Sequence, residues 1–177
     1  EHIEDLVEKA IDRKMVIGFN TKALKISERL VELLSDERVM PTSYFNVSVD
    51  AGTTESYNRV HGARMNSNLY RRVLFGVNNL SDYCRKLDIS ASYLIMKGNN
   101  SEEEIKAFAG DFRAAGCNLI RFAFPQPPRG KKEIEITAAE CSKYRERLAP
   151  LIKQLDKKHC RVILADSTWD AFDKPRT

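Results

Sequence analysis

The sequence is poor in the residues that mark several special classes of protein. Its 177 residues include only 8 Gly, 6 Pro, 4 Cys and 1 Trp. So little glycine and proline excludes a collagen-like chain and gives no sign of disorder. So few cysteines exclude a disulfide-dense secreted domain. No stretch approaches the roughly 18–20 consecutive apolar residues of a membrane-spanning helix, so the sequence predicts no membrane span.

Residues that could bind a metal are scattered along the chain. The cysteines are Cys84, Cys117, Cys141 and Cys160. The histidines are His2, His61 and His159. No two cysteines have the close spacing of a zinc or iron–sulfur site. We therefore expect no metal site in this chain and four reduced thiols, which is typical of a cytoplasmic protein.

The charge of the chain is nearly balanced. Lys and Arg number 29 and Asp and Glu number 25, which gives a net charge of +4. Nucleic-acid binding calls for a broader basic face interleaved with aromatic residues, and the sequence gives no strong signal of one. A hydrophobic content of 42% can fill the core of a single domain, which we expect to span residues 1–177.

Helical and extended patterns alternate along the chain. Apolar spacing predicts helices over residues 2–13, 27–35, 69–86, 101–115 and 137–158. Short apolar runs predict strands over residues 15–20, 44–50, 89–97, 118–124 and 161–166. A polar stretch with Gly52 and Gly62 follows the second strand, and residues 167–177 show no regular pattern. Because the chain opens at Glu1 inside a helical pattern, we expect it to be a piece of a longer protein.

Polar residues mark where several of these helices begin and end. Side-chain N-caps are expected at Ser27, Ser101 and Thr137. Glu104 and Glu140 each lie three residues after a cap, which predicts two capping boxes. Gly116 is a natural stop for the fourth helix, and Pro150 should kink or locally disrupt the fifth.

Strands separated by helices indicate parallel βα units with right-handed crossovers. Such units form either an open doubly wound sheet or part of a (βα) barrel. No glycine-rich phosphate loop follows any strand, which argues against a dinucleotide-binding sheet. We therefore expect an α/β protein with a mainly parallel sheet, a partial TIM-type barrel of about five βα units.

The second strand has one apolar and one polar face, because successive side chains of a strand point to opposite sides. The apolar face holds Phe45, Val47 and Val49. The polar face holds Tyr44, Asn46, Ser48 and Asp50. Strands of parallel sheets are usually apolar on both faces, since burying an unpaired polar group costs roughly 1–3 kcal/mol. The polar row therefore predicts a water-filled lumen or a bound ligand, with Asp50 at the carboxyl end, where α/β sites lie.

Other strands offer polar groups for the same face. Asn20 ends the first strand, Arg121 lies among small or apolar neighbours in the fourth, and Asp166 ends the fifth. Arg121 could instead form an internal ion pair with Asp50 or Asp166. Both interpretations of Arg121 remain open at this point.

Residues 47–62, Val-Ser-Val-Asp-Ala-Gly-Thr-Thr-Glu-Ser-Tyr-Asn-Arg-Val-His-Gly, resemble the fourth-strand segment of radical S-adenosylmethionine (SAM) enzymes. Residues 19–24 resemble the end of the preceding strand in that family, and residues 97–101 the exit from the following strand. Residues 116–122 resemble the entry into its sixth strand. The resemblance covers residues 2 to about 130, and the order and spacing of the motifs carry it.

This resemblance implies a partial TIM barrel whose lumen holds SAM. In the family, SAM bound to a four-iron four-sulfur cluster is cleaved reductively to a 5′-deoxyadenosyl radical, which abstracts hydrogen from a substrate. A Cys-x-x-x-Cys-x-x-Cys motif holds the cluster, and a Gly-Gly-Glu motif binds the amino group of SAM. Neither motif occurs in this chain. The chain would therefore supply the third strand onward, with the cluster ligands only in the parent protein, and would be inactive alone.

The same resemblance implies roles for individual residues. Ser48 matches the family Ser that contacts the ribose or carboxylate of SAM, and Asp50 matches an Asp that binds SAM or supports the strand end. Asn20 matches an Asn that is often structural. His61 stands where the family commonly has Arg-Gly, so an Arg for the SAM carboxylate must lie elsewhere. The candidates are Arg64, Arg72 and Arg121.

Two other functions stay open. Another TIM-barrel enzyme, such as an aldolase or isomerase, would need a Schiff-base lysine, for which Lys97 at a strand end is a modest candidate. A non-catalytic βα interaction module could use Arg129, Lys131 and Lys132 to contact acidic partners. A radical SAM parent would need a reductant and a small-molecule or peptide substrate, which the sequence does not identify. An iron assay on the parent separates this class from the other two.

Overall fold

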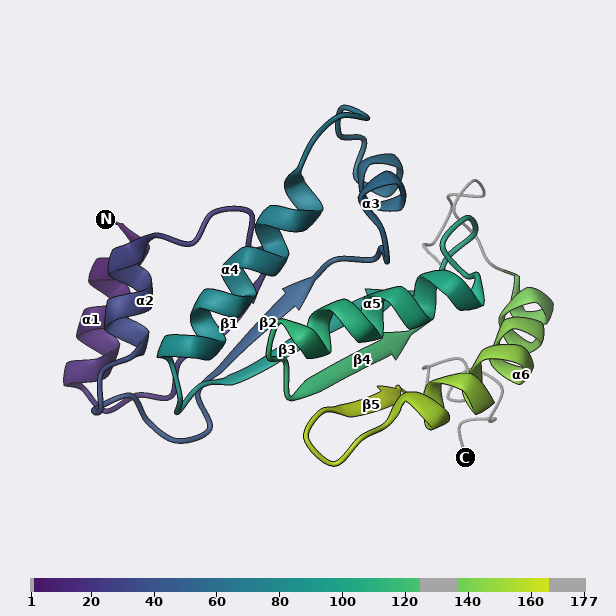
Figure 1. Ribbon diagram of the computed structural model, residues 1–177. Helices are drawn as coiled ribbons and strands as arrows, with labels where there is room; N and C mark the ends of the chain where they lie inside the picture. Colours follow the sequence, from purple (N-terminus) through teal and green to yellow (C-terminus); the bar gives the residue numbers. More distant parts are fainter. Residues whose placement is uncertain (1, 125–136, 166–177) are drawn as a thin grey trace, which may run out of the picture.

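The computed structural model describes residues 2–124 and 137–165. The helices are α1 (Ile3–Asp12), α2 (Glu28–Leu34), α3 (Thr54–Val60), α4 (Leu69–Tyr83), α5 (Glu102–Ala114) and α6 (Ala138–Leu155). The strands are β1 (Gly18–Thr21), β2 (Tyr44–Ser48), β3 (Asp88–Leu94), β4 (Leu119–Ala123) and β5 (Arg161–Leu164). Figure 1 shows these elements, which follow the predicted alternation along the chain.

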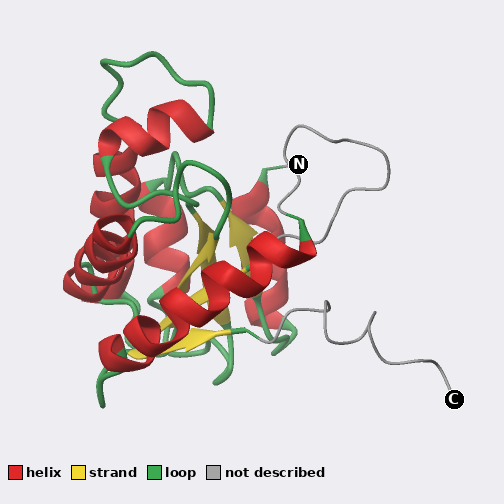
Figure 2. Cartoon of the chain, turned by 90° about the vertical axis from the view of Figure 1, so that its right-hand side faces the viewer, coloured by secondary structure: helices red, strands yellow, loops and turns green. Residues whose placement is uncertain are grey.

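The strands form one sheet in which every neighbouring pair is parallel. Their spatial order, β1-β2-β3-β4-β5, is also their order in the sequence. Right-handed crossovers between strands in this order place the connecting helices on one face of the sheet, as in a barrel, whereas a doubly wound sheet reverses its order. In Figure 2 the strands lie at the centre, with helices packed along the outside. The predicted α/β class with about five parallel βα units is confirmed.

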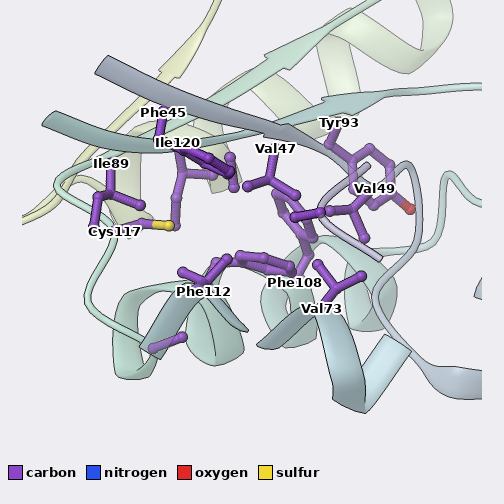
Figure 3. Packing of buried hydrophobic residues seen from close by; sticks show 14 of the residues in the cluster. Phe45, Val47, Val49, Val73, Ile89, Tyr93, Phe108, Phe112, Cys117 and Ile120 are labelled. Carbon is purple, nitrogen blue, oxygen red and sulfur yellow. The ribbon is translucent and has the colours of Figure 1, made fainter. Parts of the chain in front are cut away.

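The apolar face of β2 lies at the centre of the hydrophobic core. Phe45, Val47 and Val49 are at most 1% exposed. Figure 3 shows them above Val73 of α4 and Phe108 of α5, which are both 0% exposed. Removing one such side chain from water is worth roughly 1.5–3 kcal/mol. The apolar half of the alternation predicted for this strand is therefore confirmed.

Local sequence signals set the starts of three helices. Ser27 and Thr137 cap α2 and α6 with their side chains, and Glu140 completes the predicted capping box. Ser101 caps α5 by accepting the Glu104 amide at 3.2 Å. The Glu104 carboxylate, however, binds the loop after β2. The expected Ser101–Glu104 capping box is therefore only half formed.

Two element boundaries differ from the pattern in the sequence. β1 begins at Gly18 rather than at residue 15, and Met15 and Val16 are 54% and 53% exposed. These apolar residues lie in the connection before the strand, where the core does not cover them. α6 continues through Pro150 as one helix and ends at Leu155, before the expected residue 158.

The sequence pattern does not predict α3, which occupies part of the polar stretch after β2. Its 7 residues are too few for an apolar period to show. Thr53 accepts the Ser56 amide at 3.1 Å, and the Ser56 hydroxyl accepts the Thr53 amide at 3.1 Å, so the helix start is capped from both sides. Tyr57, 1% exposed, anchors the helix in the core.

Some expectations fall outside the part of the chain that the structure describes. They concern Asp166, the cations Arg129, Lys131 and Lys132, and residues 167–177. The four cysteines are buried and free of disulfides. Within the described ranges, no helix combines the length and apolar character needed to cross a membrane.

Candidate functional site

The face of the sheet opposite α4 and α5 is polar. The strand register aligns Asn20, Asn46 and Ser90 in one row across β1, β2 and β3. The next row, nearer the carboxyl ends, aligns Ser48, Ser92 and Arg121 across β2, β3 and β4. These six residues define what we call the polar face, and each is half-buried or exposed.

Hydrogen bonds tie the first row of the polar face together. Asn46 Nδ2 donates to Asn20 Oδ1 at 3.1 Å, and the Ser90 hydroxyl donates to Asn46 Oδ1 at 3.0 Å. Asn20 also donates to the Tyr44 hydroxyl at 3.4 Å. These bonds join β1, β2 and β3 through side chains. They give Asn20 a structural place in the sheet.

A hollow of about 660 Å³ lies against the polar face. Its walls include Asn46, Ser90 and Arg121, and it extends toward the starts of the strands at Asp88 and Arg161. Ligand pockets usually measure roughly 300–1,000 Å³. The polar face therefore borders a space of ligand size, and Ser48 lies one row further along, at the carboxyl end of β2.

Asp50 does not continue the row of β2 side chains that face this space. Its backbone has φ 57°, which turns the chain after the strand. Its Oδ1 accepts the Leu94 amide of β3 at 2.8 Å, while the next amide, of Ile95, donates to Ala123 of β4 at 2.8 Å. The carboxylate thus takes the place of a β2 carbonyl in the sheet ladder.

Burial makes the Asp50 carboxylate harder to ionise. The side chain is 9% exposed, and desolvation raises its pKa from the ordinary value of 3.8. The Leu94 amide, the charge of Lys22 and the neighbouring Ser48 hydroxyl lower this pKa. Because the Asp50 carboxylate accepts the Leu94 amide, its role is to hold the carboxyl ends of β2 and β3 together.

Asn99 locks the loop after β3 to the loop after β2. It is 0% exposed, and its Nδ2 donates to the Asp50 carbonyl and the Leu94 carbonyl, both at 2.9 Å. Its Oδ1 accepts the Met96 amide at 2.6 Å. The sequence gives one signal for this role, since Asn99 lies within the strand-exit motif of residues 97–101.

Glu104 fastens the same β2 loop to α5. Its Oε2 accepts the Gly52 amide at 2.6 Å and the Ser56 hydroxyl at 2.8 Å. A Cβ atom at Gly52 would lie 2.2 Å from the Glu104 carbonyl oxygen, so only glycine fits here. The sequence singled out Glu104 only as part of a capping box. Its partners in the structure, Gly52 and Ser56, lie about fifty positions earlier in the chain.

Lys22 and His61 form a second contact at the carboxyl ends of β1 and β2. His61 Nε2 lies 2.7 Å from the Val49 carbonyl, and its Nδ1 lies 2.8 Å from Lys22 Nζ. Because a carbonyl only accepts, Nε2 must carry the hydrogen, and Nδ1 then accepts from the ammonium group. The Tyr57 ring lies 4.3 Å from the imidazole ring. This places Lys22, which the sequence did not single out, beside Asp50.

The structure does not bring the three candidate arginines together. Arg121 lies on the polar face, in register with Ser92. Arg64 is exposed in the loop after α3 and lines a separate hollow there. Arg72 is exposed on α4, which packs on the opposite face of the sheet. Arg64 and Arg72 therefore line other hollows than Arg121, and SAM binding by either residue stays a prediction.

The internal ion pair that the sequence left open for Arg121 is not formed with Asp50. Among residues 2–124 and 137–165, no ion pair of Arg121 is formed, and the Asp50 carboxylate is turned to Leu94 instead. Asp166 lies outside the described residues. A guanidinium exposed to the hollow is available to bind an anion.

Lys97 has the surroundings of a surface residue. Its side chain is 54% exposed, and its ammonium group lies 3.1 Å from Glu140. A Schiff-base lysine needs a lowered pKa, which comes from a desolvated pocket or a neighbouring cation. An exposed lysine paired with a carboxylate has neither, so this geometry gives no support to an aldolase.

The residues that the structure describes do not suit a metal or cluster. The described residues contain no group of three or more His, Cys, Asp or Glu side chains placed to hold a metal ion. Burial raises the pKa of the Cys84 thiol to about 11 and also raises that of Cys117. Metals bind thiolates, so both environments oppose metal binding.

The fold is similar to that of SuiB from Streptococcus suis. The crystal structure of SuiB matches with a TM-score of 0.67 and 15% identity over 92% of this chain and 36% of SuiB. For SuiB bound to S-adenosylmethionine, the TM-score is 0.65 and the identity 16%, over 92% of this chain and 36% of SuiB. For SuiB bound to the precursor peptide SuiA, the TM-score is 0.64 and the identity 17%, over 93% of this chain and 34% of SuiB. No protein-family model and no curated protein matches the chain.

These similarities concern the fold alone, because the identities are low. The chain spans about a third of the length of SuiB, at 36% coverage. The match covers 92% of this chain, and so most of its parallel sheet and alternating helices.

Proposed function

We propose that this chain is the SAM-binding portion of a radical SAM enzyme, whose parent protein cleaves SAM reductively and abstracts hydrogen from a substrate. The observation that carries this proposal is the polar face, with Ser48 and Arg121 in one row beside the carboxyl ends of the strands. Support comes from the resemblance of residues 47–62 and from the shared fold of SuiB, which has been solved bound to S-adenosylmethionine.

The row of Ser48 and Arg121 suits two different parts of SAM. The Ser48 hydroxyl lies on the polar face at the carboxyl end of β2. A hydroxyl group can donate to or accept from a ribose hydroxyl. Arg121 lies two strands away, about 10 Å at roughly 4.8 Å per strand, and its guanidinium suits the SAM carboxylate.

Lys22, Asp50 and Asn99 act as supports in this proposal. Lys22 uses one N–H on His61 and keeps two more for an anionic group at the end of β1. Asp50 holds the end of β3 through the Leu94 amide. Asn99 fixes the backbone of both loops. These residues prepare the strand ends before a ligand arrives.

The cluster is assigned to parts of the parent protein outside this chain, because the described thiols are buried and dispersed. In radical SAM enzymes, SAM bound to a reduced four-iron four-sulfur cluster supplies the 5′-deoxyadenosyl radical. The role of this chain is to bind and orient SAM at Ser48 and Arg121. We propose a peptide as the substrate, supported by the structure of SuiB with the precursor peptide SuiA.

Titration of SAM into the reconstituted full-length protein tests the assignment. Ser48→Ala removes a neutral hydrogen bond worth about 0.5–1.5 kcal/mol, so the Kd should rise about two- to tenfold. Arg121→Ala removes a charged contact of about 1.5–3 kcal/mol, so the Kd should rise about ten- to 150-fold. Ser142→Ala and Arg85→Ala, at exposed positions away from the polar face, are the matched controls.

A second measurement follows 5′-deoxyadenosine formation under reducing conditions, with an iron assay on the same samples. Both variants should form less product at limiting SAM and keep the iron content of the wild type. Wild-type SAM affinity in both variants would contradict the role of the polar face. A parent protein without iron would contradict the radical SAM assignment itself.

A further inference from the structure

A groove runs between α2 and α4, on the helix-covered side of the sheet. Two hollows form it, of about 340 Å³ and about 370 Å³, and both have Val31 and Asn79 in their walls. Figure 1 shows α2 and α4 side by side, and the two helices are in contact. Because the hollows share walls, they form one surface, the α2–α4 groove.

α4 lines this groove with two large aromatic side chains that the core does not use. Phe75 and Tyr83 are 68% and 66% exposed. They lie two helical turns apart, with Asn79 midway, so they face the same side of α4. Leu24, 38% exposed, adds apolar surface at the end near Phe75. Exposed aromatic side chains beside a hollow are typical of a surface that binds a partner.

The two ends of the groove differ in charge. Lys25, Arg71 and Arg72 line the end near Phe75, and they form no ion pair with any residue that the structure describes. Glu28 and Glu32 line the other hollow. Other surface arginines do form ion pairs, for example Arg29 with Glu8 at 3.2 Å and Arg38 with Asp36 at 2.8 Å.

We propose that the α2–α4 groove docks an acidic peptide segment of a partner protein. Its carboxylates would lie over Lys25, Arg71 and Arg72, and an adjoining leucine or phenylalanine would pack on Phe75. Three unpaired cations around an apolar wall complement this kind of segment in both charge and polarity. The groove lies on the opposite side of the sheet from the polar face, so the proposal does not depend on SAM binding.

The charge pattern favours a peptide over a nucleic acid. A nucleic acid carries a negative charge at every phosphate along its length. Glu28 and Glu32 would repel such a backbone where the groove continues past Val31. A peptide can be acidic at one end only, which is what the two ends of the groove require.

The test measures fluorescence anisotropy of a labelled peptide, Asp-Glu-Glu-Leu-Phe-Ser-Gly, with the 177-residue chain. A peptide with Asn and Gln in place of the acids is the matched probe. The Arg71→Glu, Arg72→Glu double variant should weaken binding about tenfold or more, because it replaces two attractions by two repulsions. Phe75→Ala should weaken it about tenfold. The control is Lys143→Glu with Lys158→Glu, which reverses two exposed charges in and after α6.

The expected result is tight binding of the acidic peptide, weaker binding of the neutral peptide, and losses confined to the groove variants. Circular dichroism should show that all variants stay folded, because every substituted side chain is exposed. Equal loss in the α6 control would overturn the proposal, since it would mean general charge attraction. Equal competition by a single-stranded oligonucleotide would also overturn it. So would binding to this chain but not to the full-length parent, which would mean that other parts of the parent cover the groove.

Discussion

Replacing Asp50 with Ala should destabilise the chain, whereas replacing it with Asn should not. The Ala variant removes the acceptor of the Leu94 amide, which now lies 2.8 Å from Asp50 Oδ1. A hydrogen bond to a charged group is worth about 1.5–3 kcal/mol, and relief of the buried charge offsets part of the loss. We expect a net loss of about 1–2 kcal/mol, which lowers the Tm of a chain of this size by about 2–8 °C.

The Asn variant keeps an oxygen for the Leu94 amide and removes the charge. Asn also tolerates the positive φ of this position. Burial raises the pKa of Asp50 above 3.8, so the folded protein holds this proton more tightly than the unfolded chain does. The stability that this proton contributes is present below pH 3.8 and is lost as the pH rises through the folded pKa. The Asn variant does not titrate, so it should match or exceed the wild type at neutral pH.

Thermal unfolding followed by circular dichroism, from below pH 3.8 to neutral pH, measures both effects. Glu146→Ala removes an exposed carboxylate on α6 and serves as the control. Equal melting of wild type and Asp50→Ala at neutral pH would refute the bond to Leu94. A loss in Asp50→Asn as large as in Asp50→Ala would show that the charge itself stabilises the strand end.

Three further predictions concern packing and caps, each measured by denaturant unfolding. Gly52→Ala should cost about 1–3 kcal/mol because its Cβ would lie 2.2 Å from the Glu104 carbonyl, whereas Gly110→Ala, with nothing within 4 Å, should stabilise α5 by about 0.5–1 kcal/mol. Equal effects at both glycines would rule out the close contact. Phe108→Ala should cost about 3–5 kcal/mol, since this side chain is 0% exposed, and a loss below about 1 kcal/mol would mean that the core packs differently. Thr137→Ala should cost about 0.5–2 kcal/mol and leave α6 with a frayed start, unless its capping box is absent in solution.

The fold could be predicted because its signals are local. Ser27 and Thr137 cap their helices within one turn, and the alternation around Val47 follows from strand geometry alone. The sequence did not predict α3 because about two turns of helix carry no clear apolar period. The helix is instead stabilised by Tyr57, which packs in the core. Elements that depend on tertiary packing give weak local signals.

The candidate site was predictable only where strand alternation decides the outcome. Ser48 and Arg121 lie on the polar face as alternation requires. Asp50 does not lie in that row because its positive φ turns the chain after β2. An Asp residue in a sequence does not by itself predict a positive φ. The pairing of Lys22 with His61 joins positions 39 apart, so only the folded chain reveals it.

The contacts of Asn99 and Glu104 have a consequence for how the molecule moves. Asn99 joins the loop after β2 to the loop after β3, and Glu104 joins the same β2 loop to α5. Neither loop can open without breaking buried hydrogen bonds of the other, so the amides of Gly52 and Leu94 belong to one cooperative opening unit. A ligand that touched only the end of β2 would thereby slow hydrogen exchange in α5 as well.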